Sequence, residues 1–356
     1  MFEAFEIRVP AMRGKMGSRM FYALLMPMSG VPQFFKFTNW AGISPQDREQ
    51  RVLNEKRVPD LADYIGENED DYLFSSITAS YKAEPRFEPF QDGSNIGMLV
   101  LQLGDEFIIN DGQHRAAGIV KALENGVPIG KDTISVLLFP WENTERVQQM
   151  FSDLNRFVQK TSKSLDILYD KRDDLAGATL DMIEQVPVFR ELTDKESVSL
   201  GVKSTRLFTL AALYDANAEL LKGREKANQD DNVALLVRYW NTVSKHMPDW
   251  SKVLKGQKLA LELRQEKISS HSTVLRALGG LGLDLIINDD WQEKIAGLEN
   301  IDWSKKNPEW EGVCVSANSV LSNRQARAAT KAFIKGKLGM PLTDSEVRSL
   351  PHNVFH

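Results

Sequence analysis

Cysteine is almost absent from this chain, whose 356 residues include only Cys314. A single thiol excludes an intramolecular disulfide and suits a reducing compartment, and its two valine neighbours predict a buried, inert side chain. The five histidines are far apart, and no Cys/His spacing is typical of a metal site, so we predict no metal. No GxxxxGK[ST] motif is present, which excludes a P-loop.

Long apolar runs are missing as well. No segment approaches the roughly 20 apolar residues that cross a bilayer, and charged residues interrupt the first 19 positions. We therefore expect a cytoplasmic protein with no signal peptide and no membrane anchor. The net charge of −5 excludes a protein coated in positive charge, so any nucleic-acid site must be a local patch.

The distribution of strand and helix patterns predicts two domains of different class. Short apolar runs alternate with helical periodicity up to about residue 165, and beyond it the strand patterns largely stop. We predict an α+β fold in which a mixed-sheet domain, residues 1–165, precedes a mainly α-helical domain, residues 166–356. Expected strands cover residues 20–26, 34–37, 72–81, 98–103, 106–110 and 133–139, and expected helices follow Pro59 and cover residues 113–124 and 144–158.

Two glycine-containing segments bear on these expectations. Gly104-Asp105 separates two of the strands and is suited to a tight hairpin. In the second half, three apolar faces at helical spacing begin at Leu207, Val233 and Val274. The third contains Gly279, Gly280 and Gly282, which weigh against an uninterrupted helix.

The most informative segment, residues 107–120, reads FIINDGQHRAAGIV. A strand ends at Asp111-Gly112, where glycine permits a sharp turn, and a helix begins at once. The unpaired N–H groups of its first turn attract anions such as phosphate. Arg115 adds a charged fork, and Gln113 and His114 add hydrogen-bond donors. The alternative is a structural junction in which Asp111 caps the helix and Arg115 pairs with a carboxylate; the sequence leaves both interpretations open.

At this motif the chain resembles the DndB family, regulators of bacterial DNA phosphorothioation gene clusters, whose DGQHR domain takes its name from the same string. Three stretches match in order and spacing: NEKRVPDLADYIGENEDDYLFSSITASYKAEPRFEPF from Asn54, DGQHRAAGI from Asp111, and FSDLNRFVQKTSKSLDILYDKRD from Phe151. The arrangement is more distantly similar to the ParB/sulfiredoxin superfamily, in which a strand-GxxR-helix element binds nucleotide phosphates. The resemblance implies a ParB/sulfiredoxin-like fold for the N-terminal domain.

The same resemblance implies a site for ATP or a related nucleotide, with or without Mg²⁺. Gly112 and Arg115 match its phosphate-binding turn, and Asp153, Asn155 and Arg156 on a later helix match its second box. The predicted nucleotide site also includes Asp111, Gln113 and His114 of the turn. Gln113 stands where sulfiredoxins carry cysteine, which excludes sulfinic acid reduction. Gln113-His114 also replaces the Glu-Arg of ParB, so CTP specificity does not transfer. Without the resemblance, Asp153 and Arg156 are an ordinary i, i+3 surface pair.

The densest positive segment is residues 322–339, SNRQARAATKAFIKGKLG. Its cations recur at helical spacing and no acidic residue lies among them, so we predict that this stripe contacts DNA phosphates. The alternative is an ordinary solvated helix face. The stripe comprises Arg324, Arg327, Lys331, Lys335 and Lys337.

Together these observations predict a transcriptional repressor that binds double-stranded promoter DNA of a phosphorothioation gene cluster. ATP at the DGQHR turn is expected to shift its DNA affinity. The competing hypothesis is an enzyme, either a weak ATPase or another nucleotide hydrolase, or a ParB-like nuclease, in which His114 is the catalytic acid or base. A homo-oligomer would suit a palindromic operator, although the sequence does not determine the oligomeric state.

Overall fold

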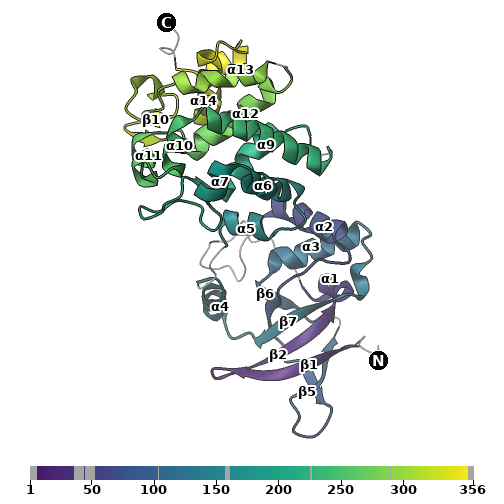
Figure 1. Cartoon of the computed structure of the whole chain (residues 1–356). Coiled ribbons are helices and arrows are strands. Elements are labelled where there is room, and N and C mark those ends of the chain that lie inside the picture. The colour runs from purple at the N-terminus through teal and green to yellow at the C-terminus, as the bar shows by residue number, and fades with distance from the viewer. Residues whose placement is uncertain are drawn as a thin grey trace. The chain divides into compact units, whose positions relative to one another are not determined.

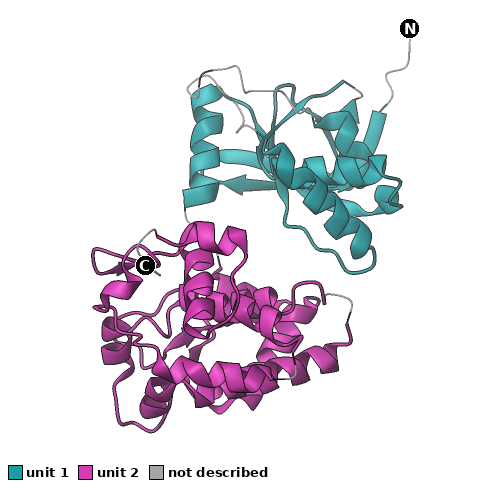
Figure 2. Ribbon diagram, turned by 90° about the horizontal axis from the view of Figure 1, so that it is seen from above, with its two compact units in different colours: residues 1–159 teal, residues 160–356 magenta. Residues whose placement is uncertain are grey.

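The computed structural model describes residues 6–35, 44, 53–102, 104–156, 161–224, 227–288 and 290–351. The chain forms two compact units, residues 1–159 and 160–356 (Figures 1 and 2). The division between them lies after Gln159, a few positions before the boundary expected after residue 165. Each unit has its own hydrophobic core.

A seven-stranded mixed sheet is the centre of the first unit, with strand order β4-β5-β1-β2-β7-β3-β6. Only β3 and β7 pair in parallel; the other neighbours are antiparallel. The mixed sheet predicted from the sequence is therefore present. The strands are β1 (Glu6–Met16), β2 (Arg19–Pro27), β3 (Ile77–Tyr81), β4 (Arg86–Pro89), β5 (Ile96–Gln102), β6 (Phe107–Asp111) and β7 (Thr133–Pro140).

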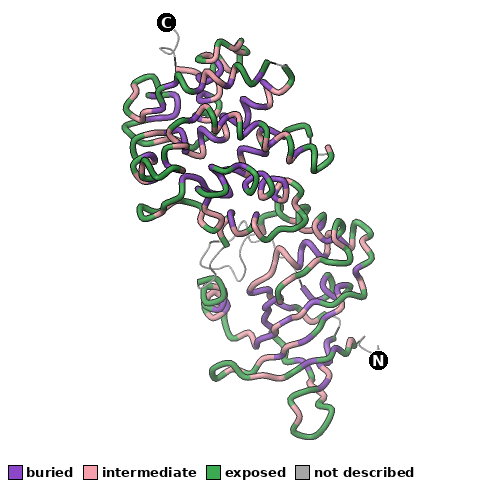
Figure 3. Tube along the Cα trace, in the orientation of Figure 1, coloured by how far each residue is buried: buried purple, intermediate pink, exposed green. Residues whose placement is uncertain are grey.

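Helices cover one face of this sheet. The helices α1 (Val31–Phe34), α2 (Val58–Glu67) and α3 (Gln113–Glu124) share a core with the inward residues of the strands. Pro59 occupies the first turn of α2, as predicted, and α4 (Thr144–Arg156) follows β7. Strands β1 and β2 bury alternate residues over part of their length, and the residues between these are exposed or partly exposed (Figure 3). The exposed apolar side chains include Met12, Met20, Leu25 and Ile96.

One predicted strand pairing and one predicted strand in this unit are wrong. The runs on either side of Gly104-Asp105 are strands β5 and β6, but they do not form a hairpin: β5 pairs with β1 and β4, and β6 pairs with β3 at the opposite edge. The Gly104-Asp105 segment therefore connects two strands that are not neighbours in the sheet. Strands distant in the sequence, and not the connecting turn, determine which partners β5 and β6 take. At 34–37, Phe34 ends helix α1 and Phe35 forms only a single bridge to Phe107; residues 36 and 37 lie outside the described residues.

The second unit is mainly helical. Its principal helices are α5 (Lys163–Tyr169), α6 (Asp174–Gln185), α7 (Pro187–Leu192), α8 (Leu210–Leu220), α9 (Gln229–Lys245), α10 (Pro248–Leu254), α11 (Ala260–Glu266), α12 (Ser272–Leu285), α13 (Trp291–Ala296), α14 (Arg324–Lys337) and α15 (Asp344–Ser349). Four two-residue strands form two small pairs, β8 (Thr193–Asp194) with β9 (Phe208–Thr209) and β10 (Val315–Ser316) with β11 (Ser319–Val320). Cys314 is buried in this core, as predicted, and burial raises the pKa of its thiol to about 11. Within the described ranges, every helix is too short or too polar to span a bilayer.

The glycines of α12 allow close helix packing and do not break the helix. A Cβ at Gly279 would overlap the backbone carbonyl oxygen of Ala216 on α8, and a Cβ at Gly282 would meet Leu220 and the Tyr239 ring. Glycine therefore lets α8 and α9 approach α12 more closely than any side chain would permit. Periodicity alone did not separate this role from a helix break.

We expect Gly279→Ala to lower the free energy of unfolding by about 1–3 kcal/mol, because a backbone carbonyl cannot give way as a side chain can. Gly280→Ala is the matched control, since its Cβ would lie at an ordinary 3.4 Å from Cδ of Lys331. The control should be neutral, or gain up to about 1 kcal/mol in helix propensity. Urea denaturation measures both, and equal stability of the two variants would contradict the packing argument.

Candidate functional site

The turn between β6 and α3 is built around Gly112. This residue is the N-cap of α3 and has a φ of +95°, a conformation that non-glycine residues rarely adopt. A Cβ at Gly112 would lie 2.8 Å from Nη2 of Arg115. Glycine at this position thus permits the backbone angle and also leaves the space that the guanidinium fills.

Arg115 folds back over this turn as a clamp. Its Nη2 donates to Oδ2 of Asp111 at 2.7 Å and to the backbone carbonyl of Ser76 at 3.1 Å, and its Nη1 donates to the Ser75 hydroxyl. The guanidinium therefore joins the end of β6 to the segment that enters β3. The side chain is 23% exposed. Its Nε is buried and has no hydrogen-bond partner in the described part of the chain.

The start of α3 has features of both interpretations of the motif. Arg115 does pair with a carboxylate, as the structural interpretation expects, but no side chain caps the helix. Asp111 therefore does not have the capping role that this interpretation assigns to it. The first turn of α3 keeps its anion-attracting character beside a partly exposed arginine.

His114 has a structural contact on the same turn. Its Nε2 accepts a hydrogen bond of 3.1 Å from the backbone N–H of Asn54, which caps the short helix before α2. An accepting Nε2 carries no proton, so the neutral ring holds its proton on Nδ1. His114 thereby ties the Asn54 segment to the DGQHR turn.

The second predicted box lies on α4, which packs against β6. Its side chains are exposed, and their hydrogen bonds run along their own helix: Asn155 donates to the carbonyl of Phe151, and Asp153 accepts from Gln149. The fold therefore brings the helix to the strand of the DGQHR turn. The hydrogen bonds that the described residues give Asp153 and Asn155 stay within α4.

The basic stripe on α14 is largely neutralised by carboxylates. Lys335 is only 5% exposed, and its Nζ lies 2.9 Å from Asp284 and 2.8 Å from Glu346. Lys331 pairs with Asp284 at 2.9 Å. Lys337, at the end of the helix, pairs with Glu309. Helical periodicity within α14 could not reveal these partners, because they lie outside that helix: Asp284 on α12, Glu346 on α15 and Glu309 before β10.

These placements correct the prediction of a five-cation DNA-binding stripe. Lys335 lies in the interior and joins three helices, so its charge is not available to DNA phosphates. Arg324 is exposed and Arg327 is partly exposed, both near the start of α14. Among the described residues, the cations of α14 without a carboxylate partner are therefore those of its first turn.

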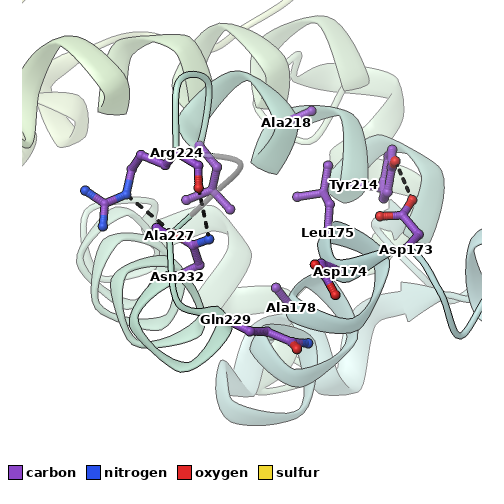
Figure 4. A pocket seen from close by; sticks show the side chains of 11 residues that line it. Asp173, Asp174, Leu175, Ala178, Tyr214, Ala218, Arg224, Ala227, Gln229 and Asn232 are labelled. Carbon is purple, nitrogen blue, oxygen red and sulfur yellow. Dashed lines mark hydrogen bonds between the residues drawn. The ribbon is translucent and has the colours of Figure 1, made fainter. Parts of the chain in front are cut away.

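The second unit also contains a cavity of about 390 Å³ beside α6, α8 and the start of α9, which no sequence motif indicated (Figure 4). Asp173 on its wall is already engaged, because its carboxylate accepts from the N–H of Ala176 and from the Tyr214 hydroxyl. Asn232 and Arg224 bond to each other on the opposite side. With two carboxylates, Asp173 and Asp174, on its wall, this cavity is unsuited to a polyphosphate.

The fold and site together define a two-unit protein with an arginine-clamped strand-turn-helix element on a mixed sheet and a helical second unit. A family model described as "DndB: DNA-sulfur modification-associated" matches residues 9–341, nearly the whole chain. The chain belongs to the DndB family, and this membership associates it with DNA phosphorothioate modification. Searches of curated proteins and of solved structures gave no match.

Proposed function

We propose that this protein is a DNA-binding repressor of a phosphorothioate modification gene cluster, and that a nucleotide at the DGQHR turn sets its DNA affinity. The observation that carries the proposal is the Arg115 clamp, which joins Asp111, Ser75 and Ser76 around an uncapped helix start. Family membership supports the association with phosphorothioation.

Two features of the turn fit a phosphate group. The buried Nε of Arg115 is a donor without an acceptor, and a donor left in that state is costly. The first turn of α3 has no side-chain cap. Arg115 and Gln113 would hold the phosphates, and the bound nucleotide would supply several negative charges at this point.

Competition between a phosphate and Asp111 would make the turn a switch. The Arg115 fork has one carboxylate partner, Asp111, and a more highly charged phosphate would compete for the same donors. Transfer of the fork would weaken its hold on Ser75 and Ser76, which enter β3. A nucleotide that binds one arrangement better than the other shifts DNA affinity by that difference.

The hydrogen bond that His114 accepts favours this effector role over the enzyme hypothesis. A general base needs a free lone pair within reach of the proton that it removes. The Nε2 lone pair of His114 is already engaged by the N–H of Asn54. We therefore assign His114 to holding the turn in place, and we assign DNA phosphate contacts to Arg324 and Arg327 on α14.

The test is a titration of labelled promoter DNA with the full-length protein, with and without ATP. We expect the dissociation constant to change about 5- to 150-fold, the usual range of allosteric coupling. ADP and a triphosphate without adenine show which part of the nucleotide matters. Equal DNA affinities under all conditions, in a protein that demonstrably binds ATP, would refute the coupling.

A further inference from the structure

A second cavity, of about 330 Å³, lies in the helical unit, and its lining is positively charged. Arg264 from α11, Lys267 just after it and Lys305 from a later loop all contribute to the wall. The lining also includes serine and threonine hydroxyls, His271 and a few aliphatic side chains, but no acidic residue. Among the described residues, therefore, this wall carries charge of one sign only.

Two of the three cations have no carboxylate partner among the described residues. Lys267 pairs with Asp302 at 3.2 Å. Arg264 donates instead to the backbone carbonyls of Leu200, Gly201 and Ser204, so neutral groups hold its charge in place. Lys305 lies 3.5 Å from the carbonyl oxygen of Arg264 and, in the described ranges, has no carboxylate partner. Two fixed positive charges thus line the cavity without a counter-charge.

A serine of low exposure belongs to the same wall. Ser270 is 7% exposed and lines the cavity. Its neighbour His271 caps α12, because Nδ1 accepts from the N–H of Thr273, and this leaves the proton of the neutral ring on Nε2. The wall therefore combines hydroxyl donors with uncompensated cations.

We propose that this cavity binds a small phosphate monoester or a similar oxyanion. Phosphate oxygens would accept hydrogen bonds from Lys305, Arg264 and the Ser270 hydroxyl, and a short organic part would lie against the aliphatic side chains. The volume is near the lower end of small-molecule sites, which suits a compact ligand. Because the wall carries cations and no carboxylate, it favours an anionic ligand over a neutral or cationic one. The proposal does not depend on the DGQHR turn, which lies in the other unit.

His271 reports on the occupant without any activity assay. Burial, with a smaller contribution from Lys305, lowers the pKa of this imidazole below its ordinary value of 6.5. An anion bound beside it would stabilise the charged ring and raise the pKa. The His271 ring resonance, followed by NMR across a pH titration with and without phosphate, measures this directly.

The deciding experiment is calorimetric titration of the full chain with inorganic phosphate, using Lys305→Ala and its matched control Lys306→Ala. Lys306 is exposed and does not line the cavity, and its substitution removes the same charge. We expect Lys305→Ala to weaken binding about tenfold or more and to abolish the shift of the His271 pKa, with Lys306→Ala unchanged. Ser270→Ala should weaken binding less. Thermal denaturation checks that each variant is folded.

Further arms identify the source of the phosphate and separate this site from the DGQHR turn. AMP and a 5′-phosphorylated oligonucleotide, each compared with its unphosphorylated form, distinguish a small molecule from a nucleic-acid end. Binding should persist in Arg115→Ala. Loss of phosphate binding in Arg115→Ala but not in Lys305→Ala would overturn the proposal, as would a wild-type protein in which phosphate neither binds nor shifts the His271 pKa.

Discussion

Lys335→Ala is expected to destabilise the helical unit by about 3 kcal/mol, because it leaves two partly buried carboxylates without their buried partner. Lys335 bonds to Asp284 on α12 and to Glu346 on α15 from within the core. The loss is at the lower end of the range for broken buried pairs, since Lys331 still contacts Asp284. The midpoint of thermal unfolding should fall by roughly 10 °C.

Arg327→Ala is the matched control, since the residue lies on the same helix and is more accessible. It should leave the unfolding midpoint nearly unchanged and, if α14 contacts DNA, reduce the salt dependence of DNA binding. Thermal unfolding and DNA titrations at several salt concentrations distinguish the two roles. A Lys335→Ala protein of wild-type stability would show that the buried network is not structural.

The same network implies a window of pH stability. Burial alone would raise the pKa of Asp284 and Glu346. Hydrogen bonds from Lys331 and Lys335 outweigh it at Asp284, and those from Lys335 and Thr343 outweigh it at Glu346, so both pKa values lie below normal. The stabilisation is therefore present above the ordinary carboxyl pKa of about 4 and is lost as the pH falls through the lowered values. Burial alone would lower the pKa of Lys335, but the two carboxylates raise it, so its contribution is lost only at strongly alkaline pH.

Arg115→Ala is expected to weaken ATP binding about 10- to 100-fold and to remove the difference in DNA affinity with and without ATP. The variant removes the guanidinium that we assign to the phosphates, together with its bonds to Asp111, Ser75 and Ser76. Arg115→Lys keeps the charge but loses the fork, so it should restore binding only in part.

Asp111→Asn is the informative counterpart, because it removes the competing charge and leaves Arg115 in place. If phosphate and Asp111 compete for the fork, Asp111→Asn should bind ATP at least as tightly as the wild type. A loss of ATP binding equal to that of Arg115→Ala would contradict the competition. Circular dichroism of both variants separates loss of the site from loss of the fold.

Local patterns predicted the elements around the candidate site well. The strand ending at Asp111, the turn at Gly112 and the helix beginning at Gln113 are present as predicted. Each depends on backbone geometry and short-range periodicity, which neighbouring residues determine. Sequence also identified Arg115 as the central cation of the turn, but not its partners Ser75 and Ser76, about 40 positions earlier.

The amino-acid sequence by itself determined which segments become strands and helices in the mixed-sheet and helical parts, because apolar periodicity reports which face of a segment is buried. Only the tertiary structure decided that β5 and β6 lie far apart in the sheet, that Gly279 permits helix contact, and that Lys335 is neutralised inside the core. Each outcome depends on residues distant in the chain. Charge, space and strand pairing become defined only when the fold brings those residues together.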